Sequence, residues 1–239
     1  MKVKFVTLTG ADDRTSIDDL LSVSEQYSFV EWGILFSKSR QGQSGYPSWS
    51  WIDGLCLFDH LRLSAHLCGQ WVTDSIRGSF TFLEEHENVD RVFGSIQINC
   101  YKDLLRQAID SPSLWRNISM IHNGHKSTIL GGDYSKVAIS VDEFLNAGVY
   151  PLYDASGGNG LSPEKWPAPF RTEYGTPLFC GYAGGLGAHN ICSELVKIEE
   201  AVGDTSIWID MQSGVRTNDC FDLSKCRKVL HEVGEWNAR

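Results

Sequence analysis

The sequence predicts an α/β protein, a single-domain (β/α)8 TIM barrel, and two observations carry that prediction. Eight short β-rich segments recur along the 239-residue chain, and their starts lie roughly 30 residues apart, the length of one βαβ unit. Helix signals separate most of these segments, so strands and helices alternate along the chain. An open doubly wound sheet usually has fewer repeats, and eight strand–helix units instead fit a closed barrel. We expect one domain over residues 1–239.

The predicted strands are short runs rich in β-branched, aromatic and other apolar residues. In chain order they cover residues 2–9, 29–36, 62–68, 92–100, 118–121, 149–154, 177–183 and 206–211. The stretch 124–140 contains Gly124, Gly131 and Gly132. Because glycine commonly marks turns and loops, we expect a long loop there, with at most one poor helix.

Helix signals fill most of the gaps between these runs. Thr15 and Ser16 precede two acidic residues, Asp18 and Asp19, which is typical of a capped N-terminus. Amphipathic or capped segments predict further helices over 49–61, 102–108, 141–146, 190–202 and 222–233. We expect Trp49, Trp51 and Trp71 to pack on the barrel from helix faces; the alternative is stacking on an aromatic or nucleobase ligand.

The composition excludes several classes of partner. The formal charge is −9 and no basic run occurs, which argues against a nucleic-acid or anionic-membrane surface. The N-terminus turns polar too early for a signal peptide, and no apolar run approaches the ~20 residues that span a bilayer. We therefore expect a cytoplasmic protein. The seven cysteines are an odd number and include no C-x-x-C pair, which disfavours a disulfide framework and a zinc ribbon, so we expect free thiols. We expect no bound metal and no other cofactor.

The candidate site lies where the predicted strands end, because active sites of such barrels form at the C-terminal ends of the strands. Three of these ends carry glycines, in segments 154–160, 183–187 and 211–215. Glycine lets backbone N–H groups approach an anion closely, and the loops after strands seven and eight are the usual phosphate seat. We expect the amides of Gly184, Gly185, Ser213 and Gly214 to bind phosphate. The alternative is that these glycines only permit turns.

At these segments the sequence resembles phosphoribosylanthranilate isomerase, a small TIM barrel of tryptophan biosynthesis. Residues 152–160 (LYDASGGNG) resemble the family's L-L-D-S…G-G-T-G, and residues 183–190 (AGGLGAHN) are similar to its S-G-G-L-x-P-x-N. Residues 209–215 (IDMQSGV) are similar to V-D-V-S-S-G-V. Weaker similarities lie at 6–10, at 33–40 (GILFSKSR, against G-F-V-F…S-P-R) and at 97–100. The resemblance is clearest over the last 90 residues.

The resemblance implies roles for individual residues. In that family an acid opens the ribose ring of a sugar phosphate and a base removes a proton from the adjacent carbon, and an aspartate and a cysteine share these tasks. The aspartate corresponds to Asp154, and the arginine that contacts the anthranilate corresponds to Arg40. Gly157, Gly158 and Asp210 belong to the matching phosphate-binding segments, where Asp210 would orient the loop.

The family's cysteine has no counterpart here, because its position is occupied by Thr9. A threonine hydroxyl has no useful basicity at neutral pH. The base would therefore move to His66 or His122, whose ordinary pKa near ~6.5 suits proton abstraction, although neither belongs to the family pattern. A structural role is the alternative for His66. A metal site formed by these histidines with Asp154 and Asp210 is a weaker alternative.

The leading hypothesis is an enzyme, an isomerase or intramolecular oxidoreductase that acts by acid/base proton transfer on a phosphorylated sugar or ribosyl compound. A homodimer is compatible with it. A second hypothesis is a binding or sequestering protein for a nucleotide or sugar phosphate, which kept the phosphate loops and lost the chemistry, as Thr9 would allow. A third, a lyase or aldolase, would need a Schiff-base lysine at a strand end, and the sequence offers none there. Fold alone does not choose among them.

Overall fold

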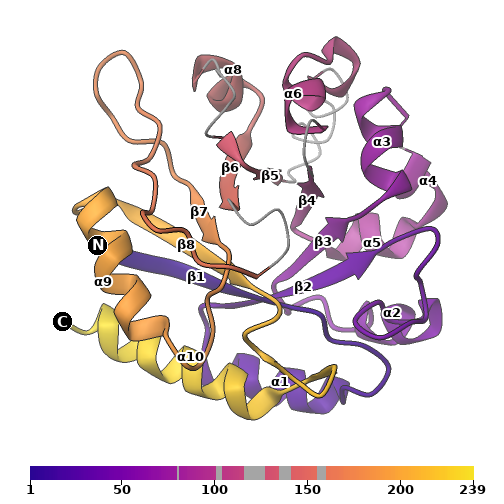
Figure 1. Ribbon diagram of the computed structural model, residues 1–239. Helices are drawn as coiled ribbons and strands as arrows, with labels where there is room; N and C mark the ends of the chain where they lie inside the picture. Colours follow the sequence, from indigo (N-terminus) through magenta and orange to yellow (C-terminus); the bar gives the residue numbers. More distant parts are fainter. Residues whose placement is uncertain (80, 101–103, 116–126, 135–140, 155–159) are drawn as a thin grey trace.

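The computed structural model describes residues 1–79, 81–100, 104–115, 127–134, 141–154 and 160–239, and it confirms the predicted (β/α)8 barrel. Eight parallel strands pair in chain order, and β1 closes the barrel on β8 (Figure 1). The strands are β1 (Lys2–Thr9), β2 (Val30–Phe36), β3 (Leu63–Leu67), β4 (Ser95–Asn99), β5 (Ser127–Gly132), β6 (Val149–Asp154), β7 (Gly181–Ala183) and β8 (Ser206–Met211).

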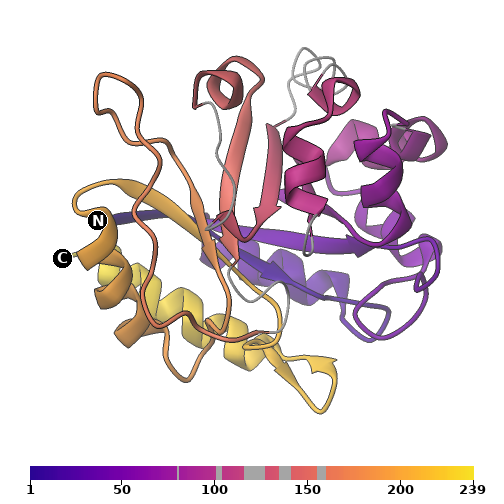
Figure 2. The same cartoon turned by 45° about the horizontal axis from the view of Figure 1, so that its top comes forward.

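Helices surround the barrel, and a short hairpin follows β8. The helices are α1 (Ile17–Gln26), α2 (Trp49–Leu55), α3 (Gln70–Ile76), α4 (Thr81–Glu85), α5 (Glu87–Val92), α6 (Leu104–Ile109), α8 (Val141–Asn146), α9 (Ile191–Val202) and α10 (Leu223–Asn237). The hairpin consists of β9 (Arg216–Thr217) and β10 (Cys220–Phe221). Figure 2 shows residues 160–180, which lead to β7, as an extended loop beside the barrel. None of the helices in the described residues is long and apolar enough to cross a membrane.

Caps that are visible in the sequence start three of the helices. The Ser16 hydroxyl accepts a hydrogen bond from the Asp19 N–H, Ser48 caps α2 and Asp222 caps α10, each satisfying N–H groups that a helix start leaves open. The helix that we expected over 49–61 ends earlier, at Leu55. As predicted, Trp71 is buried, and Trp49 and Trp51 pack against the core from α2.

The C-terminal helix α10 is hydrogen-bonded to β1, the strand that closes the barrel by pairing with β8. The Asn237 side chain in α10 accepts a hydrogen bond from the Val3 N–H at 2.9 Å and donates one to the Val3 carbonyl at 2.8 Å. Both ends of the chain therefore lie on the same side of the molecule (Figure 1). All seven cysteines are free thiols, and five of them are buried.

The fifth strand is a correction to the sequence analysis. Residues 118–121, predicted as that strand, lie outside the described residues, and the barrel's fifth strand is β5, inside the stretch that we expected to be a loop. Its last residues, Gly131 and Gly132, misled the prediction. An added Cβ at Gly132 would lie 3.0 Å from the Leu105 side chain and 3.1 Å from the Cys100 carbonyl, so this glycine allows close packing instead of a turn.

Two other strand boundaries also differ clearly from the prediction. The strand expected from residue 92 begins at Ser95, because Val92 ends helix α5. The strand expected over 177–183 is ordered as a strand only over Gly181–Ala183. Short apolar runs of this kind do not separate a strand from the loop or helix that leads into it.

Side chains along the strands alternate between the helices and the barrel interior. On one part of the interior, Phe5, Tyr150, Phe179 and Trp208 pack with neighbouring aliphatic side chains into a separate apolar cluster, in which the Phe5 and Trp208 rings stack at 5.5 Å. The other part is polar, and its members come from β1–β4 and β8. They are Thr7, Thr9, Glu31, Ser64, His66, Ser95, Gln97 and Asp210, all buried. This polar half of the interior leads up to the candidate site.

Candidate active site

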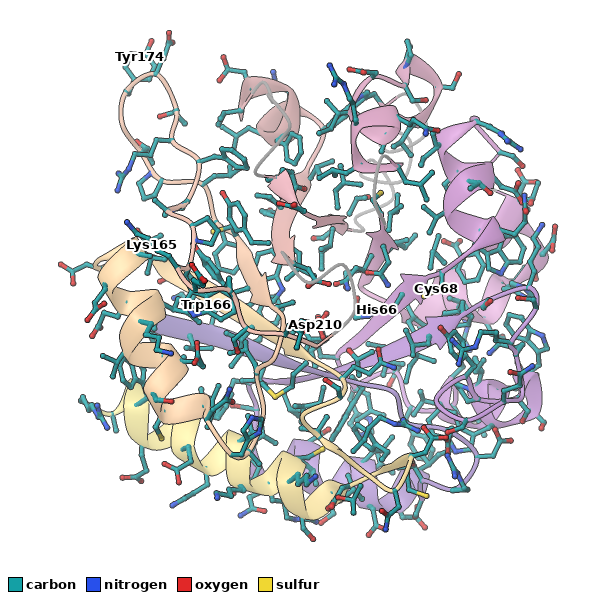
Figure 3. All side chains as sticks on the ribbon, viewed as in Figure 1. His66, Cys68, Lys165, Trp166, Tyr174 and Asp210 are labelled. Atoms are coloured by element: carbon teal, nitrogen blue, oxygen red, sulfur yellow. The ribbon has the colours of Figure 1, made fainter. Side chains whose placement is uncertain are left out.

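A cavity of about 260 Å³ opens at the C-terminal ends of the strands, where the sequence placed the site. Its polar lining comes from five strands and includes Thr9, His66, Gln97, Asp154 and Asp210. Figure 3 places His66 and Asp210 near the middle of the barrel. The barrel thus brings together four residues predicted for the site with Gln97 of β4, which belongs to the 97–100 segment of the resemblance.

The floor of the cavity is a hydrogen-bonded group centred on Asp210. The Thr9 hydroxyl donates to Asp210 Oδ1 at 2.8 Å, and Gln97 Nε2 donates to Asp210 Oδ2 at 3.1 Å. Gln97 also donates to the Asn99 side-chain oxygen at 3.0 Å. Hydrogen bonds to an ionised group are stronger than neutral ones, so Thr9 here holds a carboxylate in place.

His66 lies beside this group as a neutral imidazole. Its Nδ1 is 3.3 Å from Gln97 Nε2, an amide nitrogen that only donates, so the ring's proton is on Nε2. Burial lowers the pKa of His66, although the nearby Asp210 charge opposes the shift. Nε2 has no hydrogen-bond partner among the described residues. His66 therefore offers a proton donor on Nε2, and its expected role as the base stays a prediction.

The ring and the Thr9 side chain fit together only because residue 33 has no side chain. An added Cβ at Gly33 would lie 2.2 Å from Thr9 Oγ1 and 2.7 Å from His66 Cε1. Real Cβ atoms do not approach neighbours this closely, so Gly33 is required for the packing of the cavity floor. The sequence contains Gly33 within a strand but gives no sign of this role.

Asp154 ends β6 and is half-buried at the cavity wall, where a ligand can reach its carboxylate. Three other predicted residues lie outside the described residues: Gly157 and Gly158, which follow Asp154, and His122. His122 was chosen because it follows the predicted strand 118–121. The described fifth strand instead ends at Gly132, so that reason no longer applies.

The predicted phosphate glycines are close-packed. An added Cβ at Gly185 would lie 2.3 Å from the Ser162 backbone nitrogen, and one at Gly214 would lie 2.0 Å from the Leu186 carbonyl oxygen. Gly184 and Gly185 also have positive φ angles of 109° and 66°. Glycine is therefore needed at these positions for steric and conformational reasons, as the alternative in the sequence analysis stated.

The same loops also line a second cavity, of about 330 Å³, which adds cationic and polar side chains to them. Gly185, Ser213 and Gly214 face it, together with His189 and Lys225. The sequence analysis did not select His189 or Lys225. Lys225 lies in the first turn of α10, three residues after the capping Asp222, and this position beyond strand eight is the signal that could have found it.

Arg40 does not line the first cavity in the described residues. Its guanidinium is exposed and lies 4.3 Å from the centre of the Tyr46 ring, and Tyr46 itself lines the cavity. Arg216 instead lines it and is almost buried, donating to the Gly10 carbonyl and to Ser44 Oγ at 2.9 Å. The sequence could not indicate Arg216, because the hairpin that carries it meets the loops after β1 and β2 only in the folded chain.

Charged contacts fix this side of the cavity mouth. Arg14 pairs with the buried Asp12 at 2.6 Å and donates to Ser44 Oγ at 2.8 Å, and both Arg14 and Arg216 donate to the Asp219 carbonyl. The loops after β1, β2 and β8 are thus joined by one network. A network of several charges holds loops more firmly than isolated surface pairs do.

Comparisons with known proteins were made on the sequence and on the fold. A scan against protein-family models gave no match, and neither did a search of curated proteins. Among solved structures, N-(5'-phosphoribosyl)anthranilate isomerase from Pyrococcus furiosus is similar over 97% of this chain and 98% of that chain, at 15% identity and a TM-score of 0.52. Monomers of the dimeric phosphoribosylanthranilate isomerase from Thermotoga maritima are similar over 98% and 99%, at 13% identity and a TM-score of 0.53.

These likenesses cover nearly the whole chain at low sequence identity, so they concern the fold. The resemblance named from the sequence is confirmed at that level, while the correspondence of Thr9 to the family's cysteine stays a prediction. The protein has the eight-stranded parallel barrel seen in the phosphoribosylanthranilate isomerases.

Proposed function

We propose that this protein is an enzyme that moves a proton on a phosphorylated sugar or ribosyl compound. The observation that supports the proposal is that the two cavities adjoin, because Gly160, Gly185 and Ser213 line both. A phosphate group in the second cavity would place the carbon atoms attached to it in the first. There they would lie against Asp154 and the floor built around Asp210.

The charges of the two cavities support this division. The first is lined by three carboxylates, Asp154, Asp210 and Asp219, and by Arg216 as the single Lys or Arg in its described lining. A dianion placed there would meet net repulsion, whereas an uncharged polyol would find hydrogen-bond partners. The second cavity contains Lys225 and no carboxylate in its described lining, so the phosphate group belongs there.

The proton-transfer roles follow from the hydrogen bonds that hold Asp210 and from the position of Asp154 at the cavity wall. Asp210 is held by Thr9 and Gln97, so it orients the floor and does not exchange protons with substrate. Asp154 is the carboxylate that substrate can reach, and it takes the general acid/base role. His66, neutral with its proton on Nε2, is the second proton-transfer partner. The nearly buried cavity floor keeps water from competing for these protons.

The proposal is tested by following the fluorescence of phosphoribosylanthranilate with the wild-type protein and with Asp154→Asn. We expect consumption by the wild type and a loss of about 10²-fold or more in turnover in Asp154→Asn, the usual contribution of a general acid or base. Ligand affinity should change little, because asparagine keeps the shape of the side chain. Asp142→Asn, an exposed change on helix α8, is the matched control and should retain full activity.

Two results would count against the proposal. Unaltered turnover in Asp154→Asn would remove that residue from the mechanism. If the wild type does not consume this compound, other sugar phosphates are screened by thermal shift and then assayed for isomerisation. Binding of such a ligand without turnover would favour the second hypothesis, a binding or sequestering protein.

The proposed phosphate-binding site at Lys225 leads to a separate prediction. Lys225→Gln removes the cation of the second cavity and is expected to weaken binding of ribose 5-phosphate by about ten-fold, as loss of one charge-assisted hydrogen bond would. Lys228→Gln, an exposed change on the same helix, is the control. Calorimetric titration measures both variants. Equal affinities in the two would place the phosphate elsewhere.

A further inference from the structure

We infer that the barrel interior beneath the cavity floor binds water, and that this water links His66 to Glu31, a buried proton acceptor. An added Cβ at Gly33, on the inner face of β2, would lie 2.9 Å from His66 Nε2. Glu31 is two residues before Gly33 and faces the same way, because side chains alternate along a strand. His66 Nε2 therefore lies over the inner position next to Glu31.

Unpaired polar atoms are concentrated in this part of the protein. Six buried side-chain nitrogen or oxygen atoms have no hydrogen-bond partner among the described residues. Four of the six belong to the barrel interior: His66 Nε2, Ser64 Oγ, Ser95 Oγ and Trp208 Nε1. Native interiors leave few such groups unpaired, and ordered water is a usual partner where the protein offers none. The cluster therefore indicates a site for water.

The sheet register places the two serines beneath the floor. Ser64 pairs with Gly33 on β2 and with Ser95 on β4. Ser64 is also two residues before His66, so it is the next inner residue below the imidazole ring. Because paired residues of parallel strands face the same way, Ser95 points into the interior as well. Each hydroxyl can both donate and accept a hydrogen bond, as a partner of bound water must.

The layer of side chains around Ser64 has room for water. By the register, one layer of four from alternate strands consists of Thr7, Ser64, Ile129 and Gly181. Bulky branched residues usually fill such a layer, whereas here two members are small and one has no side chain. The Trp208 ring covers Gly181, where an added Cβ would lie 2.2 Å from it, so the remaining room is beside the hydroxyls. Glu31 is 5% and Ser95 6% exposed, so water can touch both.

A water molecule in this space completes the hydrogen bonding at both ends. Glu31 Oε1 accepts the Thr7 hydroxyl at 2.8 Å, and the described residues supply the carboxyl with no second hydrogen bond. The water accepts from His66 Nε2–H and donates to Glu31 Oε2, and a serine hydroxyl supplies its third bond. Three partners are typical of a buried water molecule.

The link allows His66 to pass a proton on without becoming charged. Gln97 Nε2 has two hydrogens but three nearby acceptors, and the farthest of them is His66 Nδ1, at 3.3 Å. His66 lines the first cavity, so Nδ1 can accept a proton from substrate. The ring then gives its Nε2 proton to the water, and the water gives one of its own to the Glu31 carboxylate. The ring ends neutral and Glu31 ends as the acid, and the reverse transfer returns a proton to the product.

The charged and titratable groups around Glu31 set the pH at which this transfer works. Burial raises the pKa of Glu31 to about 7, with Asp210 adding to the rise and Arg62 opposing it. His66 stays neutral in this range, because burial lowers its pKa. The accepting carboxylate therefore becomes more populated as the pH rises through about 7. The transfer step rests on the proposed function, whereas the water site does not.

The water site is tested without substrate, by nuclear magnetic resonance of the full-length protein. The measurements are the cross-peak between His66 Nε2–H and water, and the relaxation dispersion of water, which counts molecules held inside the protein. We expect the cross-peak in the wild type, and its loss together with one internal water molecule in Ser64→Val. Ser95→Val is a second variant and should weaken the cross-peak. Thr128→Val is the matched control and should change neither measurement.

Thr128 is a suitable control because its hydroxyl is also buried and has no partner among the described residues. It lies on the opposite face of β5, since the next residue, Ile129, packs inside the barrel. Thermal unfolding checks that every variant folds. A cross-peak that is absent from the wild type, or that survives both Ser64→Val and Ser95→Val, would overturn the inference.

The link to Glu31 is tested by titration. The nitrogen shift of His66 Nε2 should change with a midpoint near pH 7 in the wild type and stay constant in Glu31→Gln, which cannot ionise. Turnover of a sugar phosphate should rise through the same pH in the wild type only. Identical His66 titrations in the two proteins would overturn the link. A titration that depends on Glu31 in a protein without turnover would leave the link standing and remove the proposed function with its transfer step.

Discussion

Replacing Gly33 with alanine is expected to lower the free energy of unfolding by about 3 kcal/mol, the upper end of what overpacking a core usually costs. The added methyl group would lie 2.2 Å from Thr9 Oγ1 and 2.7 Å from His66 Cε1, and both side chains are buried. Thr9 cannot turn aside without losing its hydrogen bond to Asp210. Urea denaturation followed by circular dichroism measures the change.

Gly94→Ala is the matched control for this prediction. An alanine methyl group there would meet no heavy atom within 4 Å, and neither Gly33 nor Gly94 has a positive φ angle. Both substitutions therefore change the unfolded chain alike and differ only in the space available in the folded protein. Similar denaturation midpoints for the two variants would contradict the prediction. They would show that the floor of the cavity can rearrange to make room for a methyl group at residue 33.

Four strands, β1, β2, β6 and β8, lie within one residue of their predicted bounds at both ends. Their β-branched and aromatic residues give a strong strand signal. β5 gave no such signal. Its sequence, STILGG, contains two apolar residues, and its glycines are explained by contacts with α6 and β4 that only the tertiary structure reveals.

The residues of the site also divide into those that the sequence indicates and those that only the folded chain reveals. Thr9, His66, Asp154 and Asp210 could be predicted because each ends or nearly ends a strand, and the barrel geometry gathers strand ends. The hydrogen bond between Thr9 and Asp210 could not, since it joins residues 201 positions apart. Arg216 and Lys225 also escaped prediction, because they reach the cavities from the hairpin and from α10. The position of these elements over the barrel mouth depends on the path of the chain and not on any period in the sequence.

The polar half of the barrel interior leads to the second large prediction, a loss of stability as the pH rises from about 5 to 8. Burial raises the pKa of Glu31 to about 7, and the charge of Asp210 adds to the rise, while the Thr7 hydrogen bond and Arg62 oppose it. Between the ordinary glutamate value and 7, the folded protein holds a proton that the unfolded chain has released. Stability therefore falls through this window, by about 3 kcal/mol in total, and is level above it.

His66 changes the stability with pH in the opposite direction to Glu31, so the wild type alone does not reveal the contribution of Glu31. Burial lowers the pKa of His66, so below about pH 6.5 the unfolded chain binds a proton that the folded protein does not, and stability falls as the pH drops. The two effects oppose each other in the acid range. The contribution of Glu31 is therefore measured as the difference between the wild type and Glu31→Gln, in urea denaturations from pH 5 to 8.

Glutamine keeps an oxygen that can accept the Thr7 hydrogen bond but cannot ionise, so Glu31→Gln should gain stability relative to the wild type as the pH rises. Most of the gain should come between pH 5 and 7, with the curve of the difference levelling near pH 8. Glu25→Gln, an exposed change on α1, should follow the wild type at every pH. A difference that does not vary with pH would mean that Glu31 is ionised in the folded barrel throughout this range. The polar side chains of the interior would then have to stabilise a buried charge. The charge of Asp210 would also fail to raise the pKa of Glu31, although Thr7 lies between the two residues, hydrogen-bonded to Glu31 and paired with Asp210 in the sheet.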